Sequence, residues 1–159
     1  MLAMRHWLIK SEPEVFSIRD LARVKVTGWE GVRNYLARNF MRDLMAPGEL
    51  ALFYHSNAEP SGVAGVARVH GEAVPDPTQF QKKSEYFDPT SLRSGPRWMM
   101  RHFEFVERFP ALVPLATLRA DPALRGMALL QKGQRLSVQE VSAAHFAHVV
   151  ALGRATRPR

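Results

Sequence analysis

The strongest hydrophobic pattern in the chain lies between positions 32 and 44, where an apolar residue recurs at every fourth position. Four residues share this spacing: Val32, Leu36, Phe40 and Leu44. On an α-helix they form a single apolar stripe, which we expect to be buried. Trp29 and the glycine two positions later indicate a loop before the helix. The helix is expected to end at Pro47-Gly48, because proline cannot continue a helix.

The polar residues of this segment predict a second role for the helix. Asn34 stands in its first turn, where an amide oxygen can accept hydrogen bonds from free backbone N–H groups. Arg38 and Arg42 lie away from the apolar stripe and are expected to face water. We therefore expect a helix that packs on the core with one side and borders a site with the other.

Extended segments predominate in the rest of the chain. Apolar runs and alternation predict strands over 6–10, 49–55, 63–69, 98–109 and 135–139. Helices are predicted at 17–23, from a capping-box pattern, at 115–120 and 122–130 as short turns, and after Ser142. Because strands outnumber helices and no linker divides the chain, we expect one α+β domain over 5–153, built on a mostly antiparallel, barrel-like sheet with flanking helices.

The segment from Pro75 to Arg97 is the longest stretch without a clear periodic pattern. Its residues are mainly polar, and Asp76-Pro77 and Asp88-Pro89 mark turns within it. A segment of this length inside a small domain is typically a lid, a binding loop or a mobile excursion. The sequence leaves all three alternatives open.

Charge and composition narrow the class of partner. The 159 residues carry a net charge of +7 and are 46% hydrophobic, which favours a globular protein with an anionic partner such as nucleic acid. Part of the excess charge lies in the tail 154–159, which we expect to be disordered. The chain has no cysteine, no signal-peptide pattern and no apolar run that would span a bilayer, so we expect a cytoplasmic protein.

Enzymatic signatures are weak in this sequence. His145 and His148 are three residues apart, but no third metal ligand lies near them, so a solvated helix side is the better interpretation. The sequence contains no glycine-rich phosphate loop and no nucleophile elbow. Ser56 follows His55, yet neighbouring strand residues point to opposite faces, which disfavours a catalytic dyad. We therefore expect no metal, no cofactor and no catalytic residue.

Aromatic and polar side chains occur together where the predicted elements end, and this mixture fits a planar base. An aromatic face stacks on a base, while amide, hydroxyl and guanidinium groups form hydrogen bonds to its edges. Trp29, close to a glycine in a loop, is the best candidate for stacking. A tryptophan that only fills the core is equally compatible with the sequence.

Several motifs together resemble the EVE domain family. In chain order they are Trp7-Leu-Ile-Lys-Ser-Glu-Pro13, Trp29-Glu-Gly-Val-Arg-Asn34, Ala37-Arg-Asn39, Phe53-Tyr-His-Ser-Asn57, Gly65-Val-Ala-Arg68, Tyr86-Phe-Asp-Pro89 and Arg135-Leu-Ser-Val-Gln139. The resemblance extends from His6 to Leu152. It implies a PUA-like domain, similar to the YTH readers of methylated RNA, that binds a modified base in DNA or RNA without catalysis.

The resemblance also implies which residues form the pocket. Trp29 would be an aromatic wall, and the residues expected to line or support the pocket are Lys10, Ser11, Asn34, Tyr54, Ser56, Asn57, Arg135 and Ser137. Contacts to phosphate are expected from Arg33, Arg38 and Arg42. The expected partner is a nucleic acid with a modified base, such as methylated or hydroxymethylated cytosine, bound by a monomer.

Two positions depart from the family pattern. Glu49 stands where an aspartate is usual and Arg101 where an apolar strand residue is usual, and neither is expected to touch the pocket. Family members usually begin shortly before the first tryptophan, so Met4 is a candidate start besides Met1.

Two other functions remain as alternatives to the binding of a modified base. The first is a hydrolase that acts on a base or nucleotide, because related folds include such enzymes, and the second is a protein-interaction module.

Overall fold

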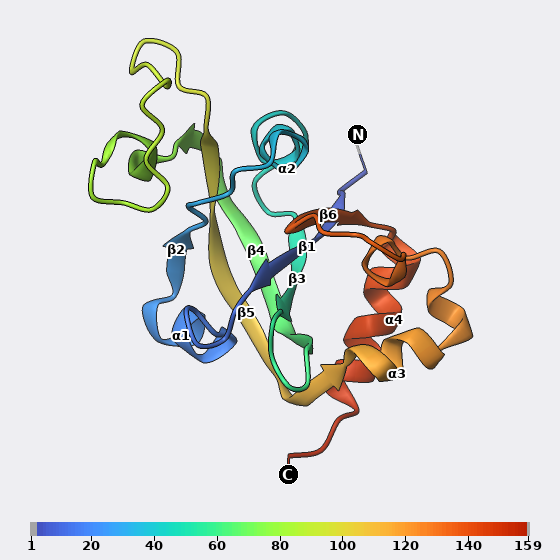
Figure 1. The fold of residues 1–159 in the computed structure, drawn as a ribbon. Coiled ribbons are helices and arrows are strands. Elements are labelled where there is room, and N and C mark those ends of the chain that lie inside the picture. The colour runs from blue at the N-terminus through green and yellow to red at the C-terminus, as the bar shows by residue number, and fades with distance from the viewer. Residues whose placement is uncertain (1–2, 159) are drawn as a thin grey trace.

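Six strands form one sheet, and helices cover both of its faces (Figure 1). The computed structural model describes residues 3–158, so Met1 lies outside the described residues. The strands are β1 (His6–Ser11), β2 (Val26–Gly28), β3 (Leu50–His55), β4 (Gly62–Pro75), β5 (Met99–Pro114) and β6 (Val138–Val141). The helices are α1 (Ile18–Val24), α2 (Tyr35–Asn39), α3 (Leu115–Ala120) and α4 (Ala143–Arg154), with a π-helical turn at Phe40–Leu44 and 3-10 turns at Pro77–Phe80, Pro122–Leu124 and Ala128–Leu130. The predicted α+β class is confirmed.

The sheet has the strand order β2-β5-β4-β3-β1-β6. β1 and β3 run parallel, whereas the other neighbouring pairs run antiparallel. Within residues 3–158 no ladder joins the edge strands β2 and β6, so the sheet is not closed and the predicted barrel is not confirmed. Because β1 and β3 are parallel neighbours, their carboxyl ends meet at the same edge of the sheet.

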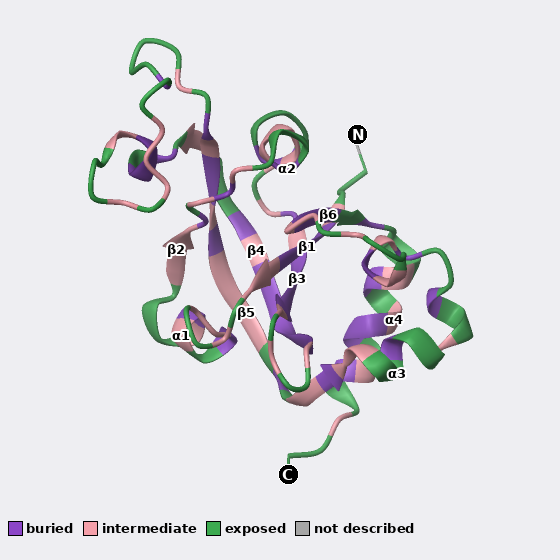
Figure 2. Cartoon of the chain, viewed as in Figure 1, coloured by how far each residue is buried: buried purple, intermediate pink, exposed green. Residues whose placement is uncertain are grey.

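Each face of the sheet has its own core. Along β1, Trp7 and Ile9 point to one face and Leu8 to the other, as the two-residue period of a strand requires. α1 and α2 cover the first face, and α3 and α4 cover the second. Figure 2 shows the buried residues concentrated along the central strands and on the inner side of α4.

The helices begin where the sequence signals place them. The Ser17 side chain accepts a hydrogen bond from the Asp20 N–H, and the Asp20 carboxylate accepts one from the Ser17 N–H, which confirms the predicted capping box. Asn34 caps α2 by accepting from the Ala37 N–H at 3.0 Å. Ser142 caps α4 in the same way.

The predicted buried stripe of the central helix is correct only in part. Val32 is buried and Phe40 packs against the core, but Leu36 and Leu44 are 49% and 39% exposed. Ala37, Met41 and Met45 are buried in their place. Both sets have a four-residue spacing, so periodicity alone cannot choose between two neighbouring stripes. The π-helical turn, in which the Met45 N–H donates to a carbonyl five residues earlier, also changes the rotation of the last residues relative to a regular α-helix.

Arg101 is buried in the sheet and supports the central helix. It is 1% exposed, and its guanidinium donates to the carbonyls of Met41, Met45 and Gly71 at 2.8–3.1 Å. Its own backbone carbonyl accepts from the Trp29 N–H at 2.9 Å. Burial lowers the pKa of Arg101, but an arginine remains charged because its ordinary value is so high. This residue therefore fixes both the end of the helix and the loop at Trp29.

Glu49 is also buried, at 3% exposure, and joins the starts of two strands. Its carboxylate accepts from the Trp7 indole N–H at 2.9 Å and from the backbone N–H groups of Arg5 and Ala46, each at 2.8 Å. These bonds satisfy the buried charge and hold β1 beside β3.

Two boundaries near the carboxyl end differ from the prediction. β6 begins at Val138, opposite Ile9, so Arg135 precedes the strand instead of starting it. Arg154 was expected to begin the disordered tail. It belongs instead to α4, and its guanidinium pairs with Glu107 at 2.6 Å.

No helix within residues 3–158 is long and apolar enough to cross a membrane.

Segment 76–98 forms an excursion that projects beyond the sheet (Figure 1). Its base is buried and held by the Gln79 side chain, which donates to the carbonyls of Asp76 and Trp98, each at 2.7 Å. The side-chain amide oxygen of Gln79 accepts from the Ser91 hydroxyl at 2.5 Å. The excursion is therefore a well-bonded loop, and part of it reaches the candidate site.

Candidate nucleic-acid interface

A cavity of about 1070 Å³ opens where the parallel strands β1 and β3 end. Its lining comes from five parts of the chain, at positions 10–16, 27–33, 56–57, 85–86 and 134–137. Its volume slightly exceeds the usual range for small-molecule pockets, roughly 300–1,000 Å³, so it has room for one nucleobase.

Trp29 borders this cavity, as predicted, but belongs mainly to the core. It is 8% exposed, and the rings of Phe16, Phe53 and Phe103 pack around it at 5.5–6.3 Å in nearly perpendicular orientations. Only a small part of the indole is therefore accessible to a ligand. The side chain supports the cavity more than it offers a stacking face.

Tyr86 is a second aromatic residue of the cavity and was not among the residues predicted for the pocket. Its ring lies against Gly31, where an added Cβ would be 2.6 Å from two ring atoms. Gly31 also has a φ of +84°, which a glycine adopts readily. The glycine is therefore required for the approach of Tyr86, which is partly exposed at the cavity.

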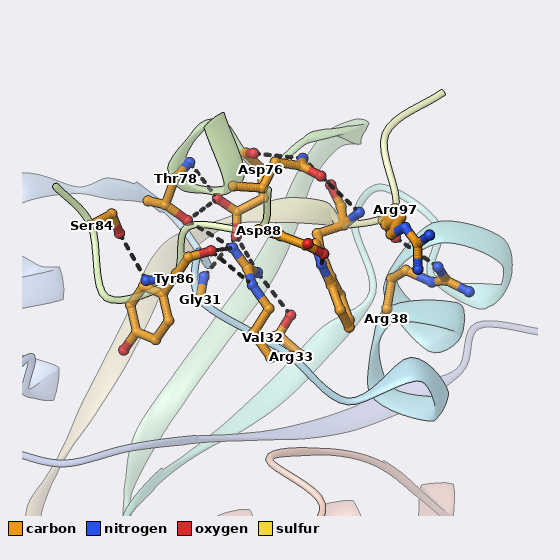
Figure 3. A network of polar contacts seen from close by, with 12 residues as sticks. Gly31, Val32, Arg33, Arg38, Asp76, Thr78, Ser84, Tyr86, Asp88 and Arg97 are labelled. Atoms are coloured by element: carbon orange, nitrogen blue, oxygen red, sulfur yellow. Dashed lines mark hydrogen bonds and ion pairs between the residues drawn. The ribbon is translucent and has the colours of Figure 1, made fainter. Parts of the chain in front are cut away.

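Arg33, which we expected to contact phosphate, lines the cavity and holds Tyr86 in place. Its guanidinium donates to the carbonyls of Val32 and Tyr86, the Asp76 carboxylate and the Thr78 hydroxyl (Figure 3). These contacts comprise five hydrogen bonds at 2.7–3.2 Å, and a guanidinium has five N–H donors. All five donors are therefore engaged by neighbouring residues, and Arg33 positions the wall of the cavity.

Asp76 connects the excursion to the loop at the cavity. Its side chain is 2% exposed, and its carboxylate accepts from the Gly31 N–H at 2.7 Å and from Arg33 at 3.1 Å. It also accepts from the N–H and hydroxyl of Thr78. The Arg33 guanidinium lies 5.6 Å from the Tyr86 ring centre and 5.1 Å from that of Trp98. These contacts fix the wall that carries Tyr86.

Most of the polar residues predicted for the pocket do line the cavity. They are Lys10, Ser11, Ser56, Asn57, Arg135 and Ser137. The Ser11 hydroxyl donates to the Phe16 carbonyl at 2.7 Å, and the Asn57 amide donates to Glu12 at 2.7 Å. The hydroxyls of Ser56 and Ser137 form no hydrogen bond with residues 3–158, so they are available to the edge of a bound base.

Two predicted pocket residues lie elsewhere. The Asn34 amide oxygen is used as the cap of α2, and the residue does not line the cavity. Tyr54 is 5% exposed and packs in the core on the opposite face of the sheet. Phe53 packs in the core on the face of the cavity, and strand alternation therefore places the next residue, Tyr54, on the other face.

The two arginines of the central helix also lie outside the cavity and already have partners. The Arg38 guanidinium donates to the Asn39 side chain and, at 2.6 Å, to the Arg97 carbonyl. Arg42 pairs with Asp43 at 2.7 Å. Neither residue lines the cavity, so the structure does not place them at the site.

His55 has a structural role that explains why it forms no dyad with Ser56. Its Nε2 accepts a hydrogen bond from the Ile18 N–H at 3.1 Å, at the start of α1. Burial lowers the pKa of His55, because it disfavours the charged imidazole. The side chain is therefore held neutral, with Nε2 as an acceptor, and it points to α1.

Several lining residues were missed by sequence reasoning. They are Glu12, Val15, Phe16, Thr27, Glu30, Glu85, Tyr86 and Gln134. Tyr86 stands in one of the family motifs, so that motif could have identified it. Glu12 and Glu30 also stand in family motifs, whereas Glu85 stands in none and gave no signal.

The fold and the cavity define an α+β domain with a base-sized pocket at one edge of its sheet. Residues 5–152 match the model of the EVE domain, and the chain belongs to this family. The resemblance predicted from its motifs is therefore confirmed.

Relatives cover nearly the whole chain. Human thymocyte nuclear protein 1 is 42% identical over 166 residues, which are 92% of this chain and 73% of that protein. A structure of a hypothetical protein from Leishmania major has a TM-score of 0.90 at 44% identity and covers 95% of both chains. A crystal structure of human THYN1 in complex with 5-methylcytosine-containing DNA has a TM-score of 0.87 at 40% identity and covers 97% of this chain and 99% of that one.

The expected cytoplasmic location is contradicted by these relatives. The vertebrate proteins that match this chain, from human, chicken and zebrafish, are all named thymocyte nuclear protein 1. A composition without cysteine or a signal peptide does not distinguish the nucleus from the cytoplasm, which is why the prediction was wrong.

Proposed function

We propose that this protein binds a modified base of DNA, with 5-methylcytosine as the first candidate, and releases it unchanged. The observation that carries the proposal is the cavity at the ends of β1 and β3, which combines aromatic rings with unpaired hydroxyl groups. The complex of human THYN1 with 5-methylcytosine-containing DNA supports the choice of ligand, because that protein shares the family and the fold.

A base in this cavity would meet three kinds of surface. Tyr86 offers a ring for stacking, and the hydroxyls of Ser56 and Ser137 offer hydrogen bonds to the base edge. Phe16 and Val32 add apolar surface that suits a methyl group. The base must leave its stack to enter, so single strands and mismatches should bind better than intact duplex.

The preference for the modified base is tested by comparing two oligonucleotides that differ in a single methyl group. A methyl group in an apolar corner contributes about 1–3 kcal/mol, which corresponds to a preference of roughly 10- to 200-fold. Fluorescence anisotropy with 5-methylcytosine or cytosine at the same position measures this ratio. Equal dissociation constants would contradict the proposal.

The aromatic wall is tested with a matched pair of variants. Tyr86→Ala removes the ring at the cavity and should weaken binding by about 1–3 kcal/mol, the usual contribution of one stacked base. Tyr35→Ala is the control, because Tyr35 is a half-exposed tyrosine that lies outside the cavity. Equal losses in the two variants would show that the base is bound elsewhere.

The absence of turnover is tested by mass spectrometry of the oligonucleotide after prolonged incubation. We expect complete recovery of the intact modified base, since His55 points to α1 and forms no dyad with Ser56. Catalytic loss of the modification, abolished in Ser56→Ala, would assign the protein to the hydrolases instead.

A further inference from the structure

The last residue of the edge strand β2 has two backbone groups that the sheet does not use. β2 pairs with β5 and with no other strand in the part of the chain that the structure describes. Just beyond β2, the Trp29 N–H donates to the Arg101 carbonyl at 2.9 Å, so these two residues form a hydrogen-bonded pair. Such pairs alternate with non-hydrogen-bonded pairs in an antiparallel ladder. Gly28, which lies opposite His102, therefore directs its N–H and C=O away from β5.

Gly28 also lines the cavity, and it is partly exposed. Because glycine has no side chain, the atoms with which it borders the cavity belong to its backbone. Neither its N–H nor its C=O has a hydrogen-bond partner among residues 3–158. Ser137, which precedes the other edge strand β6, lines the same cavity, so both ends of the open sheet border it. A free donor and a free acceptor on one residue thus lie at the cavity wall.

This backbone pair differs from the hydroxyl groups of the cavity in having a fixed polarity. The hydroxyls of Ser56 and Ser137 can rotate, and each can donate or accept, so they adapt to either kind of base edge. A backbone N–H only donates and a backbone carbonyl only accepts. Gly28 therefore matches an edge on which an acceptor stands beside a donor, as ring N3 stands beside the N4 amino group of cytosine. Thymine has the opposite order, with N3–H as a donor and O4 as an acceptor.

We infer that the Gly28 backbone reads the Watson–Crick edge of the bound base, with its N–H donating to N3 and its C=O accepting from the N4 amino group. This inference rests on the proposed function and deepens it. 5-Methylcytosine and thymine carry the same methyl group, so an apolar corner cannot distinguish them. Against thymine, Gly28 would place a donor opposite a donor and an acceptor opposite an acceptor, and unmatched buried groups are costly. The site therefore takes a methylated 4-aminopyrimidine and excludes thymine.

The first experiment compares the bases in the wild-type protein. Four single-stranded oligonucleotides differ only at one position, which carries 5-methylcytosine, thymine, cytosine or uracil, and fluorescence anisotropy measures each affinity. 5-Methylcytosine should bind more tightly than thymine, and cytosine more tightly than uracil, each by about 5- to 150-fold, the usual contribution of a matched bidentate pair. Equal affinities within either of these pairs would overturn the inference. Equal affinities for 5-methylcytosine and cytosine would overturn the proposed function instead, so the two failures are distinguishable.

The second experiment locates the discrimination at Gly28 with a matched pair of variants. Gly28→Pro removes the N–H, and an edge strand accepts proline where the N–H points away from the sheet. Gly28→Ala retains the N–H and adds the same Cβ, which would lie 3.0 Å from the flexible end of the Met100 side chain. The ligands are 5-methylcytosine and its 3-deaza analogue, in which a C–H group replaces N3. The wild type and Gly28→Ala should bind the analogue about 2- to 12-fold more weakly, the usual contribution of one hydrogen bond. Gly28→Pro should bind the two ligands equally, and a preference as strong as that of Gly28→Ala would overturn the inference.

Thermal melting shows whether Gly28→Pro is folded. If it is unfolded, NMR of the wild-type protein provides the same test, with 15N labels in the protein and in the 5-methylcytosine of the oligonucleotide. A scalar coupling across the N–H···N3 hydrogen bond should join the Gly28 amide nitrogen to N3 of the base. A coupling of N3 to the amide of a different residue, or to none, would overturn the inference.

Discussion

Trp29 and Tyr86 contribute to the site in different ways, although both are aromatic residues at one cavity. The Trp29 ring is enclosed by three other rings, and the backbone N–H of Trp29 donates to the Arg101 carbonyl. Tyr86 lies on the excursion and packs against a glycine. Burial therefore separates a residue that holds the site together from one that can meet the ligand.

Trp29→Ala should destabilise the fold by roughly 3–5 kcal/mol, because it leaves a large cavity among packed rings. Urea denaturation measures this loss, with Tyr86→Ala as a comparison that should cost far less. If Trp29→Ala were as stable as the wild type and only binding were lost, the indole would be a ligand wall and our placement of it in the core would be wrong.

His55 predicts a specific pH dependence of stability. Its pKa in the folded protein lies below its ordinary value of about 6.5, because burial disfavours the charged form. The unfolded chain therefore binds more protons in the window below pH 6.5. The stability due to neutral His55 is fully present above that pH and is lost as the pH falls.

The measurement is the free energy of unfolding at a series of pH values between about 5 and 8. The decrease in the free energy of unfolding as the pH falls should be smaller in His55→Gln than in the wild type. Identical profiles for the wild type and His55→Gln would contradict this account.

Among the structural elements, the junction of the excursion with the loop before α2 is decisive for the site. Asp76 and Arg33 are 43 residues apart in the chain and form its central contact. Through Arg33 the junction holds the Tyr86 carbonyl, and through Asp76 it holds Gly31. A disturbance of this ion pair should therefore reach the cavity wall.

A double-mutant cycle with Asp76→Asn and Arg33→Gln tests the junction. Residues in one hydrogen-bond network show coupling energies of about 0.5–3 kcal/mol, so the double variant should lose less stability than the sum of the two single losses. Affinity for the modified base should fall in all three variants. Additive losses of stability would show that the ion pair is not a coupled unit.

Local signals predicted the elements well, whereas their packing required the structure. Ser17 and Asp20 identified the start of α1, because a capping box involves only neighbouring residues. The buried side of α2 was misjudged, because it depends on the π-helical turn and on the distant Arg101. The junction at Asp76 was not foreseen for the same reason, since no local pattern links positions 33 and 76.

For the molecule as a whole, the site forms where one parallel pair interrupts an otherwise antiparallel sheet. This pairing brings the ends of β1 and β3 together, so Ser11 and Ser56 become neighbours, with a bond of 3.0 Å from the Ser56 N–H to the Ser11 carbonyl. The motifs identified both residues as part of the site. Tyr54 shows the limit of motifs, because membership in one does not reveal to which face a side chain points.

The position of the bound base is the most direct test of the whole account. An oligonucleotide with a 13C-labelled methyl group on a single 5-methylcytosine can be bound to the protein and examined by NMR. We expect intermolecular NOEs from this methyl group to Phe16, Val32 and the Tyr86 ring, which line the cavity. NOEs to the surface of the central helix around Arg42, with none to these three residues, would contradict the assignment of the cavity as the base-binding site.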